Sequence, residues 1–337
     1  MPDLINYLLS GVLVNEYTIA STSGLLNSQT QTWSSSLFAR LGLPEKWFSK
    51  VSKGGTVLRS LSPRIAQNLK IEPFDVIAGA GHDTAAAVLA VPYVDEKPTV
   101  FISCGTWSLV GMESQTVLTS LEALNAGLTN EGCFDGGIRL LKNTTGLWII
   151  QELQRDWQLQ GEEIGFAEMV VLAREVKDNR SFINPNAAIF ASPGDMEEKV
   201  KDYCRMSGQI VPETKGEVVR TVLESLALAY HQTVEQLEEL TGKEIARIQM
   251  VGGGIQNELL CQLTANFARK PVITGPIEAS ALGNVLSQLL TLGIVQSREE
   301  AQNLIRQSEL LKSYLVEDLD NVETSQQFFK SLVEKGE

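Results

Sequence analysis

The fold is decided by the stretch DVIAGAGHDTAAAVLA, residues 75–90. Its apolar residues Val76 to Ala78 predict a short strand, and the glycines after them predict a tight turn. The small residues that follow Asp83 predict a helix. A strand that runs through a glycine turn into a helix is typical of α/β proteins, in which ligands bind beyond the carboxyl ends of the strands.

The same alternation continues outward from this stretch. Further strands are predicted at Thr99–Ser103, Arg247–Val251 and Val272–Thr274, and further helices at Lys215–Thr241, Asn257–Ala268 and Ala279–Leu292. Before residue 75 we expect helices and irregular connections, with helices within Met1–Val14 and at Trp33–Leu41 and no strand before the first helix. The chain is therefore predicted to be an α/β protein.

A domain boundary is predicted near Val91–Lys97, where VPYVDEKP places prolines and charges between a helix and a strand. With 337 residues and 43% hydrophobic content, the chain is long enough for two cores. We expect one domain at residues 1–93, a second at 94–320 and a C-terminal helix or tail at 321–337.

The composition excludes several classes of partner. The formal net charge is -13, so the surface repels nucleic acid and anionic membranes, whereas backbone amides and a metal ion can still bind a nucleotide. The four cysteines form no C-x-x-C pair, and with only two histidines no zinc-ligand set can be assembled. The segment Met1–Val14 fits neither a signal peptide nor a membrane span. These features predict reduced thiols in a cytoplasmic protein.

Asp83 is the first candidate for chemistry. A carboxylate at the end of a strand, flanked by small residues, can accept the proton of a sugar hydroxyl as that oxygen attacks phosphorus. The alternative is that Asp83 or Thr84 only caps the following helix. Taken alone, the stretch favours the cap.

Two further glycine turns can face an anion or a nucleotide. Cys104-Gly105-Thr106 joins two apolar runs, and its hydroxyl and amides suit an anion, although an ordinary hairpin is equally consistent. Gly252–Gly254 ends a strand before a helix that begins near Asn257, so a base or phosphate can lie against the backbone, although such turns are often structural. The small residues of GPIEASALGN, residues 275–284, allow a second backbone to pack closely.

A polar segment lies within NEGCFDGGIRLLKNTTGLWIIQEL, residues 130–153. Its hydrogen-bonding residues are Asn130, Glu131, Asp135, Arg139 and Asn143. So many hydrogen-bonding side chains in a short segment suit a ligand with several hydroxyl groups. The alternative is a solvated loop before a capped helix, with Trp148 in the core.

Taken together and in this order, the segments resemble the FGGY family of carbohydrate kinases, most closely its members that phosphorylate L-rhamnulose. The resemblance covers essentially the whole chain and rests on MPDLINYLLSG (1–11), NEYTIASTSGLLN (15–27), AGHDTAAAV (80–88), FISCGTWSLVG (101–111), TNEG (129–132), LLKNTTGLW (140–148) with Gln151, VGGGIQN (251–257) and GPIEASALGN (275–284). It implies an α/β, actin-like ATPase (ribonuclease H-like) fold, in which residues 1–93 are the C-terminal part of the sugar-side domain and residues 94–320 are the nucleotide-side domain.

The resemblance also implies roles for particular residues. Asp83 is expected to be the proton acceptor, and the residues expected around the sugar are His82, Asp83, Thr84 and Asn143. The residues expected to contact ATP are Thr106, Gln151, Gly253 and Asn257, and Mg²⁺ is expected to accompany ATP without a ligand residue from this chain. The implied reaction transfers the γ-phosphoryl group to the primary hydroxyl of L-rhamnulose, with L-fuculose and xylulose as alternative acceptors.

The chain departs from the family at its start. Members open with a strand hairpin that carries an Asp-x-Gly phosphate motif, and Asp135-Gly136 is no substitute because it lies in the sugar-side segment. We therefore expect a truncated first domain and little or no kinase activity from this polypeptide alone. The alternatives are a non-catalytic sugar- or nucleotide-binding remnant and one half of a split kinase whose second chain supplies the segment.

Overall fold

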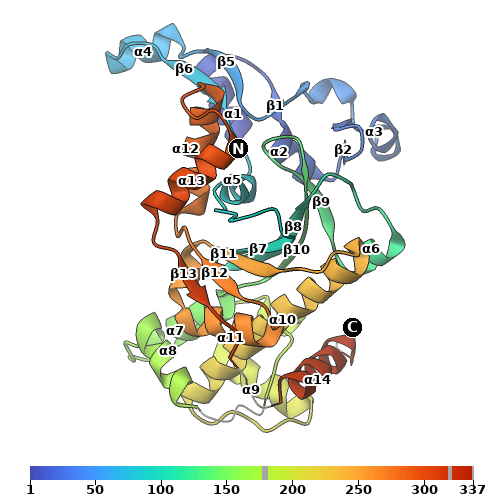
Figure 1. Ribbon diagram of the computed structural model, residues 1–337, viewed down its shortest axis with the longest axis vertical. Coiled ribbons are helices and arrows are strands. Elements are labelled where there is room, and N and C mark those ends of the chain that lie inside the picture. Colours follow the sequence, from blue (N-terminus) through green and yellow to red (C-terminus); the bar gives the residue numbers. More distant parts are fainter. Residues whose placement is uncertain (177–180, 318–320, 336–337) are drawn as a thin grey trace. The chain divides into compact units, whose positions relative to one another are not determined.

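The computed structural model describes residues 1–176, 181–317 and 321–335, and the chain divides into two compact units (Figure 1). The first unit contains residues 1–94, 112–141 and 278–310, and the second contains residues 95–111, 142–277 and 311–337. The predicted boundary near residue 93 coincides with the first point at which the chain leaves the first unit. The spatial division differs from two contiguous domains because the chain returns to the first unit twice.

The first unit begins with short elements. They are α1 (Pro2–Ser10), β1 (Asn15–Glu16), α2 (Tyr17–Ala20), η1 (Ser21–Ser23), β2 (Leu26–Asn27), β3 (Thr32–Trp33), α3 (Ser35–Leu41), η2 (Glu45–Trp47), β4 (Val51–Ser52), β5 (Thr56–Ser60), α4 (Pro63–Leu69), β6 (Asp75–Ala78) and α5 (Asp83–Leu89). The helices α1 and α3 and the strand β6 were predicted. The prediction of helices and irregular connections before residue 75 missed strands β1 to β5. Strands β1 to β4 are each two residues long, too short to show alternation in the sequence.

The later segments of the first unit bring a helix against α5. These segments contain α6 (Leu121–Asn125), β9 (Thr129–Gly132), the start of β10 (Ile138–Thr145), α12 (Ala279–Thr291) and α13 (Arg298–Ser308). In Figure 1, α12 lies beside α5. A Cβ atom on Gly283 of α12 would come within 1.8 Å of the carbonyl oxygen of Ala86 in α5. The small residues of α12 therefore serve close packing, as predicted.

The strands β9 and β10 form an antiparallel pair. Arg139 lies directly opposite Glu131, and Ile138 lies opposite Gly132. Both Arg139 and Glu131 are buried. The alternative of a solvated loop was therefore wrong for Asn130, Glu131 and Arg139, which lie on paired strands, whereas the exposed Asp135 lies in the turn between β9 and β10.

The second unit contains a mixed sheet. Within it the strand order is β13 (Lys312–Tyr314), β12 (Val272–Thr274), β11 (Arg247–Val251), β7 (Thr99–Cys104) and β8 (Trp107–Ser114). The neighbours β12, β11 and β7 are parallel, whereas β7 and β8 form an antiparallel hairpin. The predicted strands and the hairpin at Cys104-Gly105-Thr106 are confirmed.

The helices of the second unit include the longest helix among the described residues. They are α7 (Trp148–Leu159), α8 (Phe166–Glu175), η3 (Ala188–Phe190), α9 (Met196–Met206), α10 (Lys215–Thr241), η4 (Gly253–Gln256), α11 (Glu258–Ala268) and α14 (Val322–Lys335). A capping box of Thr214 and Glu217 starts α10, and Gly242 in the left-handed conformation ends it. Figure 1 shows α8 and α11 beside α10, which is buried along most of its length. The predicted bounds of α10 are confirmed.

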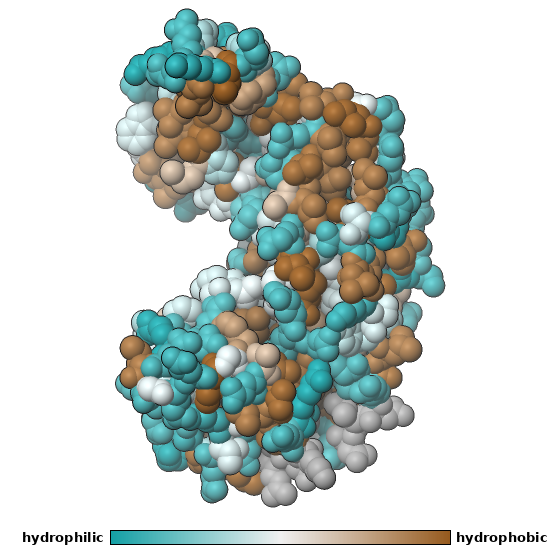
Figure 2. Space-filling model, turned by 90° about the vertical axis from the view of Figure 1, so that its left-hand side faces the viewer, coloured by the Kyte–Doolittle hydropathy of each residue, from teal (hydrophilic) through white to brown (hydrophobic). Residues whose placement is uncertain are grey.

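Apolar side chains remain exposed on the first unit. They include Leu4, Ile5 and Leu8 of α1, Val57 of β5 and Phe74. Figure 2 shows apolar side chains gathered near the top of the view, at the height of α4, β5 and β6 in Figure 1. Within residues 1–176, 181–317 and 321–335, no helix combines the length and the apolar character needed to cross a bilayer.

Candidate active site

The predicted site residues fall into two sets, one in each unit. His82, Asp83 and Thr84 lie together at the β6–α5 turn of the first unit. Thr106, Gln151, Gly253 and Asn257 lie in the second unit, on the turns and helices that follow β7, β10 and β11. Asn143 on β10 also belongs to the second unit, so the structure does not group it with the other residues predicted to bind the sugar.

A buried carboxylate holds the β6–α5 turn in place. Glu16 has no solvent exposure, and its Oε2 accepts hydrogen bonds from the amide of Gly81 at 3.0 Å and from the hydroxyl of Thr18 at 2.5 Å. The Thr18 hydroxyl oxygen in turn accepts the amide of His82 at 3.0 Å. Burial raises the pKa of Glu16, and the hydrogen bonds from Thr18 oppose that rise. The turn is thus fixed by residues far away in the sequence.

The Asp83 carboxylate projects from this fixed turn. Its side chain is 81% exposed, and its Oδ1 accepts the amide of Thr84 at 2.7 Å. The N-cap position is His82, whose side chain makes no capping hydrogen bond, and Asp83 is the first helical residue. Neither Asp83 nor Thr84 occupies the N-cap, but Asp83 Oδ1 satisfies one amide of the first turn, which leaves Oδ2 without a role in the helix start.

The backbone and side chain of Thr84 are tied to Asp83. Thr84 is buried, and its hydroxyl lies 3.4 Å from Asp83 Oδ1. The Asp83 carbonyl oxygen accepts the hydroxyl of Ser280 on α12 at 3.1 Å. The start of α5 is therefore held by its own first turn and by the neighbouring helix.

The sequence singled out Arg139 only as one of several hydrogen-bonding groups suited to a polyhydroxylated ligand, and the structure places it beside His82. Its guanidinium is buried, and Nη2 lies 3.3 Å from His82 Nδ1 and 2.9 Å from Glu131 Oε2. The ring of His82 also places Nε2 3.7 Å from Asp83 Oδ1. Burial, with a smaller effect of the Arg139 charge, lowers the pKa of His82 below its usual value. His82 is thus held as a neutral imidazole beside the carboxylate at neutral pH.

In the second unit, Thr106 and Gln151 contact each other. The Thr106 hydroxyl donates a hydrogen bond to Gln151 Oε1 at 3.0 Å, which joins the β7–β8 turn to α7. The amide of Gly146 donates to the Thr106 carbonyl oxygen at 3.1 Å. Thr106 is exposed, so its hydroxyl lies at the surface of the unit. The structure therefore brings together two of the four residues predicted to contact ATP.

The three glycines after β11 have different surroundings. A Cβ on Gly252, where φ is +91°, would lie 2.8 Å from the Cys104 carbonyl oxygen, and one on Gly254 would lie 2.2 Å from Cys104 Sγ. A Cβ on Gly253 would have no atom within 4 Å. The outer two glycines thus serve packing against β7, whereas the backbone of Gly253 is open to a ligand.

The remaining predicted residues have mixed surroundings. Asn257 is the N-cap of α11, and its Oδ1 accepts the amide of Leu260 at 3.0 Å. Asn143 is exposed on β10. A capping role therefore explains Asn257 without a ligand, whereas no structural role is evident for Asn143.

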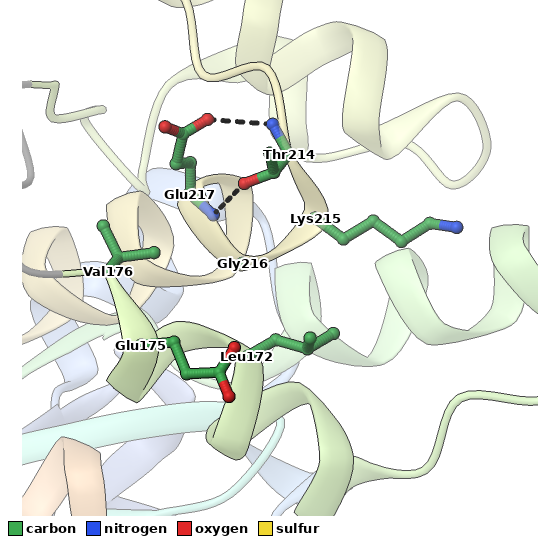
Figure 3. Close-up of a pocket in the computed structure, with 7 residues that line it drawn as sticks. All are labelled: Leu172, Glu175, Val176, Thr214, Lys215, Gly216 and Glu217. Atoms are coloured by element: carbon green, nitrogen blue, oxygen red, sulfur yellow. Dashed lines mark hydrogen bonds between the residues drawn. The ribbon is translucent and has the colours of Figure 1, made fainter.

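A pocket of about 750 Å³ lies elsewhere in the second unit. Its lining residues are Leu172, Glu175, Val176, Thr214, Lys215, Gly216 and Glu217, from the end of α8 and the start of α10 (Figure 3). Figure 3 shows that Glu217 and Thr214 bond to each other's backbone, so the amides of these two residues already have partners. None of the predicted site residues lines this pocket, and its Thr214 and Glu217 side chains are engaged in the capping box.

Two family models match the chain. The N-terminal domain of the FGGY family of carbohydrate kinases matches residues 1–90, and the C-terminal domain of the same family matches residues 100–292. The interval between the two matches contains the predicted boundary at residue 93.

Curated relatives match nearly the full length of the chain. A rhamnulokinase of Bacteroides thetaiotaomicron is 39% identical over 99% of the chain. Rhamnulokinases of Oceanobacillus iheyensis and Pectobacterium carotovorum are 36% and 40% identical, each over 93% of the chain. The chain spans 68%, 65% and 61% of the lengths of these three relatives.

Solved structures share the fold. A ligand-bound xylulose kinase of Lactobacillus acidophilus superposes with a TM-score of 0.76 at 18% identity, covering 99% of this chain and 66% of that one. A glycerol kinase of Plasmodium falciparum with ADP gives a TM-score of 0.75 at 14% identity, covering 99% and 65%. These likenesses confirm the predicted actin-like ATPase fold. Because models of both family domains match and relatives are up to 40% identical, the chain belongs to the FGGY family of carbohydrate kinases.

Proposed function

We propose that the chain has the activity of a rhamnulokinase, transferring the γ-phosphoryl group of ATP to the primary hydroxyl of L-rhamnulose. The name of the relatives that are 36–40% identical supports the choice of sugar. The observation that carries the reaction type is the exposed Asp83 carboxylate on a turn fixed by Glu16 and Thr18.

In this proposal, Asp83 receives the proton of the attacking hydroxyl. The sugar oxygen forms a bond to the γ-phosphorus while the bond from that phosphorus to the bridging oxygen breaks, and ADP leaves with the bond electrons. An alcohol is a much weaker acid than a carboxylic acid, so the proton moves to Asp83 only as the new bond forms. His82, Thr84 and Asn143 are assigned to the sugar.

The second unit is assigned to the nucleotide. The open backbone of Gly253 and the hydroxyl of Thr106 are groups that can bind phosphates or ribose without side-chain charge, and Gln151 and Asn257 complete the assigned set. Mg²⁺ is expected with ATP. The resemblance assigns it no ligand residue in this chain.

Other acceptor substrates, and an enzyme completed by a second chain, are the alternatives to this proposal. Solved structures with this fold include xylulose, gluconate and glycerol kinases, so the fold itself does not select the sugar. A second chain that completes the enzyme has no support from the comparisons. Low activity of this polypeptide alone stays a prediction.

The test combines binding and turnover. Calorimetric titrations with L-rhamnulose, L-fuculose, xylulose and ATP with Mg²⁺ are expected to show binding of ATP and strongest sugar binding for L-rhamnulose. Turnover is followed as ADP release in a coupled assay. Where it is detectable, Asp83→Asn should lower kcat by about 10²–10⁴-fold, because it removes the proton acceptor. The circular dichroism spectrum of this variant should stay unchanged. Binding of neither ligand, or unchanged turnover in Asp83→Asn, would contradict the proposal.

A further inference from the structure

A buried guanidinium lies behind the proposed proton acceptor. Arg139 has no solvent exposure and faces Glu131 across the β9–β10 pair. Its Nη2 donates to Glu131 Oε2 at 2.9 Å, and its Nη1 donates to the carbonyl oxygen of Gly132. Two acceptors on β9 therefore fix the guanidinium plane, which leaves a second N–H of Nη2 directed at His82.

The contact with Arg139 decides which nitrogen of His82 carries a proton. Nη2 lies 3.3 Å from His82 Nδ1, and a guanidinium has donors but no acceptor. Nδ1 must therefore accept, so the proton of the neutral ring lies on Nε2. The opposite tautomer would place two N–H groups against each other in a buried position.

The Nε2–H group lies on the side of Asp83. Nε2 is 3.7 Å from Asp83 Oδ1, the same oxygen that accepts the amide of Thr84 at 2.7 Å. Among the described residues, the contacts of this carboxylate all go to Oδ1. Oδ2 is therefore the oxygen left to accept a proton from a ligand.

We infer that Arg139 is a positioning residue that sets the Nε2–H tautomer of His82, which directs an N–H toward Asp83 Oδ1, 3.7 Å away, and leaves Oδ2 for the sugar hydroxyl. The second half of this inference rests on the proposed function. The first half, the tautomer, can be measured in the chain without any ligand.

The experiment is a long-range ¹H–¹⁵N correlation spectrum of the full chain labelled in its histidine rings. The chain has two histidines, so His231→Gln assigns the signals of His82. At pH 7 we expect His82 to show an unprotonated Nδ1 and a protonated Nε2. A protonated Nδ1, or a ring protonated on both nitrogens, overturns the inference.

Variants then test the dependence on Arg139. Arg139→Met is combined with Glu131→Gln, since removal of the cation alone would leave a buried carboxylate unpaired. This double variant should show mixed tautomers and bind L-rhamnulose about tenfold more weakly, the equivalent of one misplaced hydrogen bond. Arg139→Lys, which keeps a buried donor, should restore the Nε2–H form. A single Nε2–H tautomer in the double variant overturns the role of Arg139.

A control separates this role from the general loss of a paired arginine. Arg298 is also a paired arginine of the first unit, bound to Glu113 and Asp135. Arg298→Met should leave the His82 tautomer unchanged, and a change there would count against a specific effect of Arg139. If the wild-type chain shows the expected tautomer but binds no sugar, the proposed function fails while the tautomer assignment stands.

Discussion

The β6–α5 turn of the first unit and the β11–α11 turn of the second have the same sequence pattern, a strand that passes through glycines into a helix. In the first turn, side chains supply the polar groups, and Glu16, Thr18 and Arg139 hold them. In the second turn, Gly252 and Gly254 pack against Cys104, and Gly253 offers bare backbone. One pattern thus presents either a positioned carboxylate or an open main chain, and the partner residues decide which.

The largest expected effect is the loss of the carboxylate that holds the first turn. Glu16→Ala removes the acceptor of the Thr18 and Ile19 amides, the Thr18 hydroxyl and the Gly81 amide. Because these donors are largely buried, we expect the free energy of unfolding to fall by about 3–5 kcal/mol. Urea-induced unfolding followed by circular dichroism measures it.

Glu16→Gln serves as the control for this prediction. Its one remaining oxygen can accept part of these hydrogen bonds, so we expect a smaller loss of stability than in Glu16→Ala. A loss below about 1 kcal/mol in Glu16→Ala would show that the turn does not depend on side-chain acceptors.

The next effect concerns the packing of the second turn. Gly254→Ala would place a Cβ 2.2 Å from Cys104 Sγ and 2.9 Å from the Cys104 carbonyl oxygen, so we expect a loss of about 2–3 kcal/mol in unfolding free energy. Cys104→Ala in the same chain should recover part of that loss because it removes the thiol. Urea-induced unfolding of the single and double variants provides the measurement.

Gly253→Ala is the matched control in the same turn. Its Cβ meets no atom within 4 Å, so the unfolding free energy should change by less than about 0.5 kcal/mol. If Gly253→Ala and Gly254→Ala destabilised the chain equally, the three glycines would not divide into packing and open positions.

The sequence predicted local features of both turns but not the residues that support them. The strand and helix of each turn follow from short-range apolar spacing and glycine positions, and β6, α10, β11 and β12 were placed within one residue of their bounds. The contact between Arg139 and His82 joins residues 57 positions apart, and that between Glu16 and Gly81 joins residues 65 positions apart. Such pairs depend on strand pairing and packing, which local spacing does not encode.

One signal for Arg139 was nevertheless present. The segment after residue 129 places Arg139 beside the apolar residues Ile138, Leu140 and Leu141, and a buried arginine in a strand requires a buried acceptor. A short apolar run that follows the turn residues Gly136-Gly137 could have indicated a strand in place of a solvated loop. The identity of its partners, Glu131 and His82, could come only from the structure.

The smallest expected effect separates capping from nucleotide binding at Asn257. Asn257→Ala removes the acceptor of the Leu260 amide and should cost about 1 kcal/mol of unfolding free energy. Asn257→Asp keeps a capping oxygen, so stability should stay within about 0.5 kcal/mol, whereas its negative charge should weaken ATP binding about tenfold if the residue contacts the nucleotide. Calorimetric titration with ATP and Mg²⁺ measures that affinity.

Ser120 supplies a matched cap in the first unit, because its Oγ accepts the amide of Ala123 at 3.2 Å at the start of α6. Ser120→Ala should lose a similar amount of stability and leave the ATP affinity unchanged. Full ATP affinity in Asn257→Asp would mean that Asn257 only caps α11. The nucleotide assignment in the second unit would then depend on Thr106, Gln151 and the open backbone of Gly253 alone. The second turn would in that case act through its main chain, which makes its contrast with the side chains of the first turn sharper.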